Sequence, residues 1–276
     1  MKFEKTEVFN FEGALRGMRN PFESWDKSDS GRCSEIDCNK CSQDKLGGTE
    51  CSKIGRWDFA IGKNDMELAQ KLIKAGSVHR KFMRQIFVSV DITAPLYWWK
   101  EFDTYKVGTV ANSTSTMHKL ASTPITRECF EMDDFEDVDI EVNGMVYSNK
   151  DSWNTQIAEC EYLRQKYNET KEKKYWKALI RKLPESWLQT RTVTMNYENL
   201  LGICSFDQRR NHKLTEWSKS FIGWAKSLPY AEELLFIKNK PVINFVMTYE
   251  NGVYECKYNT GETFKSYDGK EWTEVL

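Results

Sequence analysis

The stretch Trp98–Lys119 joins bulky aromatic residues to a run of hydroxyl and amide side chains. The polar members of this stretch are Thr104, Thr109, Asn112, Ser113, Thr114, Ser115 and Thr116. Burying an unpaired polar group costs about 1–3 kcal/mol on mutational scales, so the run forms either a solvated loop or the wall of a polar pocket. Lys106, His118 and Lys119 flank it, and such cations bind phosphate and carboxylate groups. The stretch predicts an anion site, with an ordinary solvated loop as the alternative.

Half of the eight cysteines lie close together in a polar segment. Their spacing is C-x4-C-x2-C-x9-C, and they are Cys33, Cys38, Cys41 and Cys51. Four thiolates at such spacing suit tetrahedral Zn²⁺, because a C-x2-C pair lets two sulfurs reach one ion from a tight turn. We expect a structural zinc site, with an iron–sulfur cluster or a loop of free thiols as alternatives. The other cysteines are expected to be small buried hydrophobic residues, and they are Cys129, Cys160, Cys204 and Cys256.

The bulk composition restricts the class of protein. A chain of 276 residues holds one large domain, or a domain with a small module. With 40 basic and 41 acidic residues the formal charge is −1, so no overall field attracts nucleic acid. No run approaches the ~20 apolar residues of a membrane span, and the N-terminal MKFEKTEVFN lacks the apolar core of a signal peptide. We expect a soluble, cytoplasmic protein without a membrane partner.

Sequence patterns predict the elements that precede and include the polar stretch. Residues 1–25 open with strand-like alternation, and residues 26–56 form the polar insertion that carries the clustered cysteines. Asn64 and Glu67 have the spacing of a capping box, which predicts a helix that ends at Gly76. The alternation over residues 85–92 predicts a half-buried strand, and Thr93 and Pro95 mark the start of the next helix.

The second half of the chain is predicted to be mainly helical before it turns to strands. Asn143-Gly144 predicts a small hairpin within the acidic region 131–150. The acidic residues are expected to form a solvated face, with metal binding as the weaker alternative. Helices are predicted over residues 151–173, 174–182, 184–203 and 212–228. After residue 238, short alternating runs separated by Asn-Gly, Thr-Gly and Asp-Gly predict a small antiparallel meander.

Three features, in this order, resemble the flavin-dependent thymidylate synthase family. The first is a helix followed by His79, Arg84 and a strand; the second is the stretch Trp98–Lys119. The third is Leu183-Pro184, then NYENLL from Asn196, the basic pair Arg209-Arg210, His212 and Glu216-Trp217. Together they cover roughly residues 60–235. The order and spacing carry the resemblance more than any single motif does.

The resemblance implies a fold and a reaction. The fold would be α+β, a mainly helical core with a central antiparallel sheet over residues 1–238, with the meander at 239–276 as an addition. The chain would use FAD, reduced folate and NADPH for one-carbon transfer to a pyrimidine nucleotide such as deoxyuridine monophosphate (dUMP). It would do so as a homotetramer with sites shared between subunits.

The resemblance also implies roles for individual residues. Ser115 would lie beside the reacting pyrimidine as the catalytic residue. The implied cofactor-binding residues are His79, Arg84, Lys106, Asn112, Asn196 and Asn199. The implied substrate-binding residues are Ser113, His118, Lys119, Arg209, Arg210 and His212.

The chain departs from the family at charged positions. The family signature is Arg-His-Arg, two residues, Ser, four residues, Ser, one residue, Arg. With Ser115 as the second serine, the slots for Arg-His-Arg and the last Arg hold Tyr105, Lys106, Val107 and Met117. Glu198 stands where the family usually has arginine. Such losses also fit a non-catalytic nucleotide- or partner-binding protein on the same fold, and they are compatible with a phage-encoded member.

Overall fold

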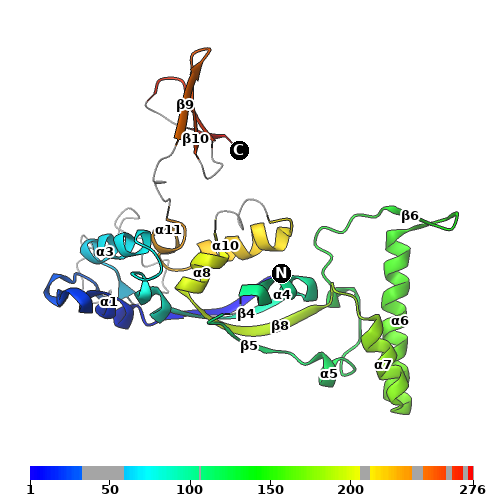
Figure 1. Ribbon diagram of the computed structural model, residues 1–276. Helices are drawn as coiled ribbons and strands as arrows, with labels where there is room; N and C mark the ends of the chain where they lie inside the picture. Colours follow the sequence, from blue (N-terminus) through cyan, green and yellow to red (C-terminus); the bar gives the residue numbers. More distant parts are fainter. Residues whose placement is uncertain are drawn as a thin grey trace. The chain divides into compact units, whose positions relative to one another are not determined.

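The computed structural model describes residues 1–32, 59–105, 107–205, 212–237, 245–258, 263–269 and 273–275. The chain divides into two compact units, Met1–Phe236 and Ile237–Leu276 (Figure 1). Among the described residues, no helix has the length and apolar character that crossing a bilayer requires.

A four-stranded antiparallel sheet forms the centre of the first unit (Figure 1). Its strands, in spatial order, are β1 (Lys2–Phe9), β4 (Phe87–Pro95), β8 (Leu188–Asn196) and β5 (Val110–Ser113). In β4, alternate residues are fully buried, which confirms the half-buried strand predicted from the alternation over residues 85–92. The register pairs Phe87 with Asn196 and Pro95 with Leu188.

The helix predicted over residues 184–203 is wrong for most of its length. Residues Leu188–Asn196 form β8, and only Tyr197–Ile203 are helical, as α8. The segment TRTVTM alternates β-branched residues, which favour strands, and Val193 and Met195 point into the core. Pairing with both β4 and β5 places the segment inside the sheet, and this tertiary context overrides any helical spacing.

Aromatic residues from two helical segments cover one face of the sheet. Helix α4 (Leu96–Phe102) starts directly after β4 with Pro95 at its N-cap, as the sequence predicts. Its Trp98 packs against Trp217 and Phe221, with ring centroids 5.4 and 5.6 Å apart. These partners lie on the π-helix η8 (Glu216–Phe221), which continues into α10 (Ile222–Lys226). Most of the helix predicted over 212–228 is therefore present, with its first part wound as a π-helix.

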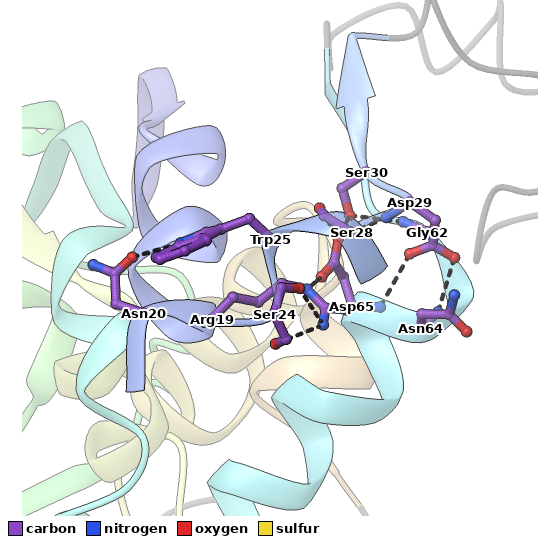
Figure 2. A network of polar contacts seen from close by, with 10 residues as sticks. All are labelled: Arg19, Asn20, Ser24, Trp25, Ser28, Asp29, Ser30, Gly62, Asn64 and Asp65. Atoms are coloured by element: carbon purple, nitrogen blue, oxygen red, sulfur yellow. Dashed lines mark hydrogen bonds and ion pairs between the residues drawn. The ribbon is translucent and has the colours of Figure 1, made fainter. Parts of the chain in front are cut away.

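Two helices lie at the N-terminal side, and the cap of the second is not predicted by its local sequence. Helix α1 (Phe11–Arg19) follows β1, and α3 (Lys63–Lys74) follows the strand pair β2 (Gly31–Arg32) and β3 (Phe59–Ala60). The capping box predicted from Asn64 and Glu67 is wrong. Instead the carboxylate of Asp29 accepts from the backbone N–H groups of Asn64 and Asp65 at 2.9 and 3.1 Å (Figure 2).

A helical hairpin packs on a smaller core of its own. It consists of α6 (Asn149–Thr170) and α7 (Lys173–Lys182), which match the two predicted helices closely. Its buried residues are Leu120, Ile125, Phe130, Cys160 and Leu179. The hairpin β6 (Asp139–Val142) and β7 (Met145–Ser148) precedes α6, and its Asn143-Gly144 turn has positive φ at both residues, as predicted.

The remaining elements of this unit are short. They are η1 (Asn20–Phe22), η2 (Trp25–Lys27), η5 (Lys81–Gln85), η6 (Asp103–Tyr105), α5 (Thr116–Lys119), η7 (Arg127–Cys129) and α11 (Ala231–Leu234).

The second unit is an antiparallel meander, as the turn signals predict. Its strands follow the order β12-β11-β10-β9, and they are β9 (Phe245–Glu250), β10 (Val253–Tyr258), β11 (Thr263–Ser266) and β12 (Thr273–Val275). The turn Asn251-Gly252 joins β9 to β10 with positive φ at both residues. Three of the four cysteines expected to be buried are buried, and Cys129 is partly exposed.

Candidate active site

The first turn of α8 is closed by two asparagine side chains. Oδ1 of Asn196 accepts from the backbone N–H of Asn199 at 2.9 Å, and Oδ1 of Asn199 accepts from the N–H of Asn196 at 3.0 Å. Nδ2 of Asn199 also donates to the Val107 carbonyl at 2.7 Å. Gly108 has φ +81°, and a Cβ there would lie 3.1 Å from Asn199. The asparagines thus join α8 to the middle of the polar stretch, at Val107 and Gly108.

An arginine that sequence reasoning missed lies beside this turn. Nε of Arg80 donates to both carboxylate oxygens of Glu198, at 3.0 and 2.8 Å, and both side chains are largely buried. Glu198 occupies the position where the resemblance implies arginine, so the guanidinium here comes from residue 80 instead. The signals for it in the sequence are the acidic Glu198 at a position where the resemblance implies arginine and the arginine that directly follows His79.

His212 lies against the aromatic core next to the same polar stretch. Its ring stacks on Trp217 with centroids 4.9 Å apart, and its Nδ1 accepts from the backbone N–H of Leu214 at 3.1 Å. Nε2 lies 3.4 Å from Oε1 of Glu101. The stack and the carboxylate together hold the imidazole in one orientation, with its Nε2 side toward helix α4.

Residues just after α4 carry further charge. Nη1 of Arg191, on β8, donates to both carboxylate oxygens of Asp103 at 3.1 and 3.3 Å, and its guanidinium lies 4.2 Å from the centroid of Trp99. Burial, and then the nearby Glu101 carboxylate, raise the pKa of Tyr105. Tyr105 fills the first arginine slot of the family signature, so that slot holds a neutral phenol.

A buried acidic cluster anchors the π-helix. The hydroxyl of Tyr97 contacts Oε1 of Glu216 and lies 3.2 Å from Oε2 of Glu131. Burial raises the pKa of Glu131, and burial followed by the Glu216 contact raises the pKa of Tyr97. One phenol proton serves only one carboxylate at a time, so the two carboxylates share Tyr97 as their common donor. The cluster ties η8, and with it Trp217 beneath His212, to α4.

Three of the substrate residues implied by the resemblance, Ser113, His118 and Lys119, lie away from the α8 turn. In β5, Asn112 pairs with Thr192 and Ser113 with Arg191, five residues before Asn196 on β8. At about 3.4 Å per residue, Ser113 is therefore about 17 Å along the strand from the α8 turn. Ser115 then caps α5 by accepting from the His118 backbone N–H at 3.1 Å.

Within one chain the candidate residues thus form two groups, and His212, beside Glu101 and Trp217, is assigned to neither. We call the first the α8 group: Arg80, Asn196 and Asn199. The second is the α5 group: Ser113, Ser115, His118 and Lys119. In the α5 group, Ser113, His118 and Lys119 are exposed. Asn112 lies on β5 next to the α5 group and is exposed as well.

Other predicted residues have a less defined place. His79 is exposed and its backbone N–H donates to the Gly76 carbonyl at 3.0 Å, while exposed Arg84 donates to the Ser77 carbonyl at 3.3 Å. Several predicted ligands lie outside the described residues, and they are Lys106, Arg209, Arg210, Cys33, Cys38, Cys41 and Cys51. In the part of the chain that is described, no group of three or more His, Cys, Asp or Glu side chains could hold a metal ion.

The α8 group has donors available for an anionic cofactor. Arg80 uses only Nε on Glu198, and both of its Nη nitrogens have no partner among the described residues. The same holds for Nδ2 of Asn196 in the described part of the chain. A guanidinium anchored through Nε and free at Nη is arranged to bind a phosphate, and an amide N–H₂ suits a carbonyl acceptor. The residues present therefore fit a phosphate-bearing ring cofactor such as FAD.

Comparison with known proteins bears on the fold. Two solved structures of the flavin-dependent thymidylate synthase ThyX from Helicobacter pylori, both with FAD and dUMP, are similar to this chain. One has a TM-score of 0.54 at 14% identity and the other 0.55 at 15% identity; each match covers 86% of this chain and 98% of that chain. At such identity the likeness shows the fold alone, and it confirms the predicted α+β fold. No family model matches the sequence, and no curated protein matches it.

Proposed function

We propose that this chain binds FAD and a pyrimidine nucleotide such as dUMP, and that it catalyses flavin-dependent one-carbon transfer to that nucleotide. One observation carries the proposal: Arg80 and Asn196 offer free polar groups at the first turn of α8, on a fold shared with two solved structures of one enzyme bound to FAD and dUMP. A bound flavin supplies hydride chemistry, while the protein supplies position and electrostatics.

Different residues are proposed to bind the cofactor and the nucleotide. In this proposal the Nη groups of Arg80 bind a phosphate of the cofactor, Nδ2 of Asn196 donates to a ring carbonyl, and His212 contacts ligand from its Trp217 stack. His79, Arg84, Lys106, Asn112 and Asn199 support the same cofactor. The nucleotide is held by Ser113, His118, Lys119, Arg209 and Arg210, with Ser115 beside the pyrimidine. Reduced folate and NADPH are the proposed one-carbon donor and reductant.

The separation of the α8 and α5 groups calls for a second copy of the chain. A flavin must meet the pyrimidine closely for hydride transfer, yet the groups lie about 17 Å apart along β8. We propose a homotetramer in which the α8 group of one subunit faces the α5 group of another. This arrangement agrees with the exposure of Ser113, His118 and Lys119.

Subunit mixing tests this arrangement. Asn196→Ala and Ser115→Ala variants should each lose most one-carbon transfer to dUMP. After the two are unfolded and refolded together, random assembly should return about a quarter of the wild-type activity, because some interfaces carry both intact groups. Two wild-type copies refolded in the same way give the reference. Mixed protein as inactive as either variant contradicts a shared site.

An absorbance spectrum from 300 to 550 nm tests the cofactor. The purified, unsupplemented protein is expected to show flavin bands, and added dUMP should perturb them because both ligands meet in one site. A spectrum that stays flat after addition of FAD contradicts the proposal, whatever the oligomeric state.

A second function is favoured by the charges at the site. Arg80 and Arg191 are each paired with a carboxylate, and the signature slots at Tyr105 and Val107 are neutral. A dinucleotide phosphate bound at either arginine would lie beside the carboxylate of Glu198 or Asp103, and the like charges would repel. The alternative is a non-catalytic nucleotide- or partner-binding protein, which would be colourless and would bind dUMP without flavin.

We also propose that Cys33, Cys38, Cys41 and Cys51 hold a structural zinc ion in an insertion over about residues 26–56. Thiolates of this kind persist in a reducing compartment, which fits a cytoplasmic protein. In the same proposal, residues 1–238 are the enzyme-like domain and 239–276 are a separate β module.

A further inference from the structure

A cavity of about 270 Å³ lies beside α1, and it is separate from the α8 and α5 groups. Its walls include Leu15, Phe59 and Trp25 on the apolar side, and Glu12, Arg16 and Arg19 on the charged side. None of these residues belongs to the α8 or α5 group. Pockets for drug-sized ligands span about 300–1,000 Å³, so this cavity suits a smaller molecule, of the size of one amino acid.

A buried carboxylate makes the floor of the cavity rigid. Asp65 is fully buried, and it accepts from Nε of Arg19 at 2.5 Å and from the hydroxyls of Ser28 and Ser30 at 2.7 and 2.5 Å (Figure 2). These contacts join α1, α3 and the segment between η2 and β2. The cavity is therefore formed before any ligand binds.

A count of donors identifies the groups left for a ligand. The hydroxyl protons of Ser28 and Ser30 are engaged by Asp65, so these serines offer no donor. Arg19 uses Nε on Asp65 and Nη1 on Ser24, while Nη2 has no partner among the described residues. Arg19 is only 4% exposed. Arg19 lines the cavity, and its free Nη2 is a donor there for an anionic ligand group.

The helix α1 adds one charge of each sign. Arg16 is exposed, makes no ion pair with any described residue and lines the cavity together with Arg19, so the two arginines provide positive charge for an anionic group there. Glu12 lies one turn earlier on the same helix face, and it too is without an ion pair in the described part of the chain. A cation beside the anion is the group that Glu12 can bind.

The opposite wall presents a fixed aromatic ring. Trp25 is 51% exposed, yet its Nε1 donates to Oδ1 of Asn20 at 2.9 Å, which holds the indole in place (Figure 2). The indole lines the cavity and offers a flat apolar surface to a ligand there. Together with Leu15 and Phe59 it forms a surface for a flat apolar side chain.

We propose that this cavity binds an aromatic α-amino acid. The carboxylate contacts Arg16 and Nη2 of Arg19, the ammonium contacts Glu12, and the ring lies on Trp25. This site is independent of the function proposed for the α8 and α5 groups. The ammonium and the carboxylate of the ligand are both bonded to its α-carbon, so they are close enough to contact Glu12 and Arg16, which lie one helical turn apart.

Calorimetric titration of the full chain tests the proposal with three probes. L-phenylalanine is expected to bind more tightly than 3-phenylpropionate, which lacks the ammonium, and than 2-phenylethylamine, which lacks the carboxylate. Arg16→Ala should weaken L-phenylalanine and 3-phenylpropionate about tenfold or more, since a charged hydrogen bond is lost. Glu12→Gln should weaken L-phenylalanine and 2-phenylethylamine but not 3-phenylpropionate, which has no ammonium, and Trp25→Ala should weaken all three.

Arg181→Ala is the matched control, because Arg181 is an exposed arginine in the last turn of α7, away from the cavity. It should leave all three affinities unchanged. The proposal fails if L-phenylalanine does not bind, if Arg16→Ala binds it as the wild type does, or if the ammonium makes no difference. None of these outcomes depends on flavin binding.

Discussion

Replacement of Asp65 by alanine is expected to destabilise the first unit by about 3–5 kcal/mol, the cost of breaking a buried ion pair from one side. Asp65 is fully buried and Arg19 is 4% exposed. Without the carboxylate, the Arg19 guanidinium keeps its charge in a largely buried site after losing its ion-pair partner. The hydroxyls of Ser28 and Ser30 lose their acceptor at the same time. Each effect adds to the loss of stability.

Chemical unfolding in urea, followed by tryptophan fluorescence, measures this effect. The matched control is Glu185→Ala, which removes the exposed ion pair between Lys100 and Glu185 and should change the free energy of unfolding by about 1 kcal/mol or less. Arg19→Met combined with Asp65→Leu should recover part of the loss, because no charge then remains buried. An Asp65→Ala variant as stable as the Glu185→Ala control would show that the contacts of Asp65 do not stabilise the first unit.

Elements with local signals were predictable from the sequence. The alternation of β4, the apolar spacing of α6 and the Asn-Gly turn at residue 143 each depend on neighbours within one element. Strand β8 was not predictable in this way, because the segment TRTVTM is too short for its periodicity to distinguish a strand from a helix. Its pairing with β4 makes it a strand. The cap of α3 was not predictable either, since Asp29 lies far earlier in the sequence than Asn64.

The candidate site shows the same limit. Asn196 and Asn199 were chosen by resemblance, and the structure adds that they form a reciprocal cap tied to Val107. Arg80 was missed because its partner Glu198 is 118 residues away. A pair that distant leaves no periodic pattern, although an acidic residue at an expected arginine position is a reason to search for a displaced cation.

Replacement of Arg80 by alanine is expected to weaken FAD binding by about 10- to 150-fold, which corresponds to about 1.5–3 kcal/mol for hydrogen bonds to a charged group. Arg80 is the described arginine with two free Nη nitrogens next to the α8 turn, and Glu198 holds it in place through Nε. Absorbance titration of the apoprotein with FAD measures the change. The control is Arg164→Ala, because Arg164 pairs with Glu161 at similar burial on α6, far from this turn.

The exchange of the two residues separates a binding role from a structural one. Arg80→Glu alone places two carboxylates face to face, and Glu198→Arg alone places two guanidinium groups face to face, so each should lose both stability and FAD affinity. The double variant restores the ion pair and returns arginine to the position that the family resemblance implies. If the guanidinium binds cofactor, the double variant should regain stability and most of the affinity, because the cation stays at the same turn of α8. Recovery of stability without any recovery of FAD affinity would show that the pair is only structural and that the cofactor, if bound, contacts other residues.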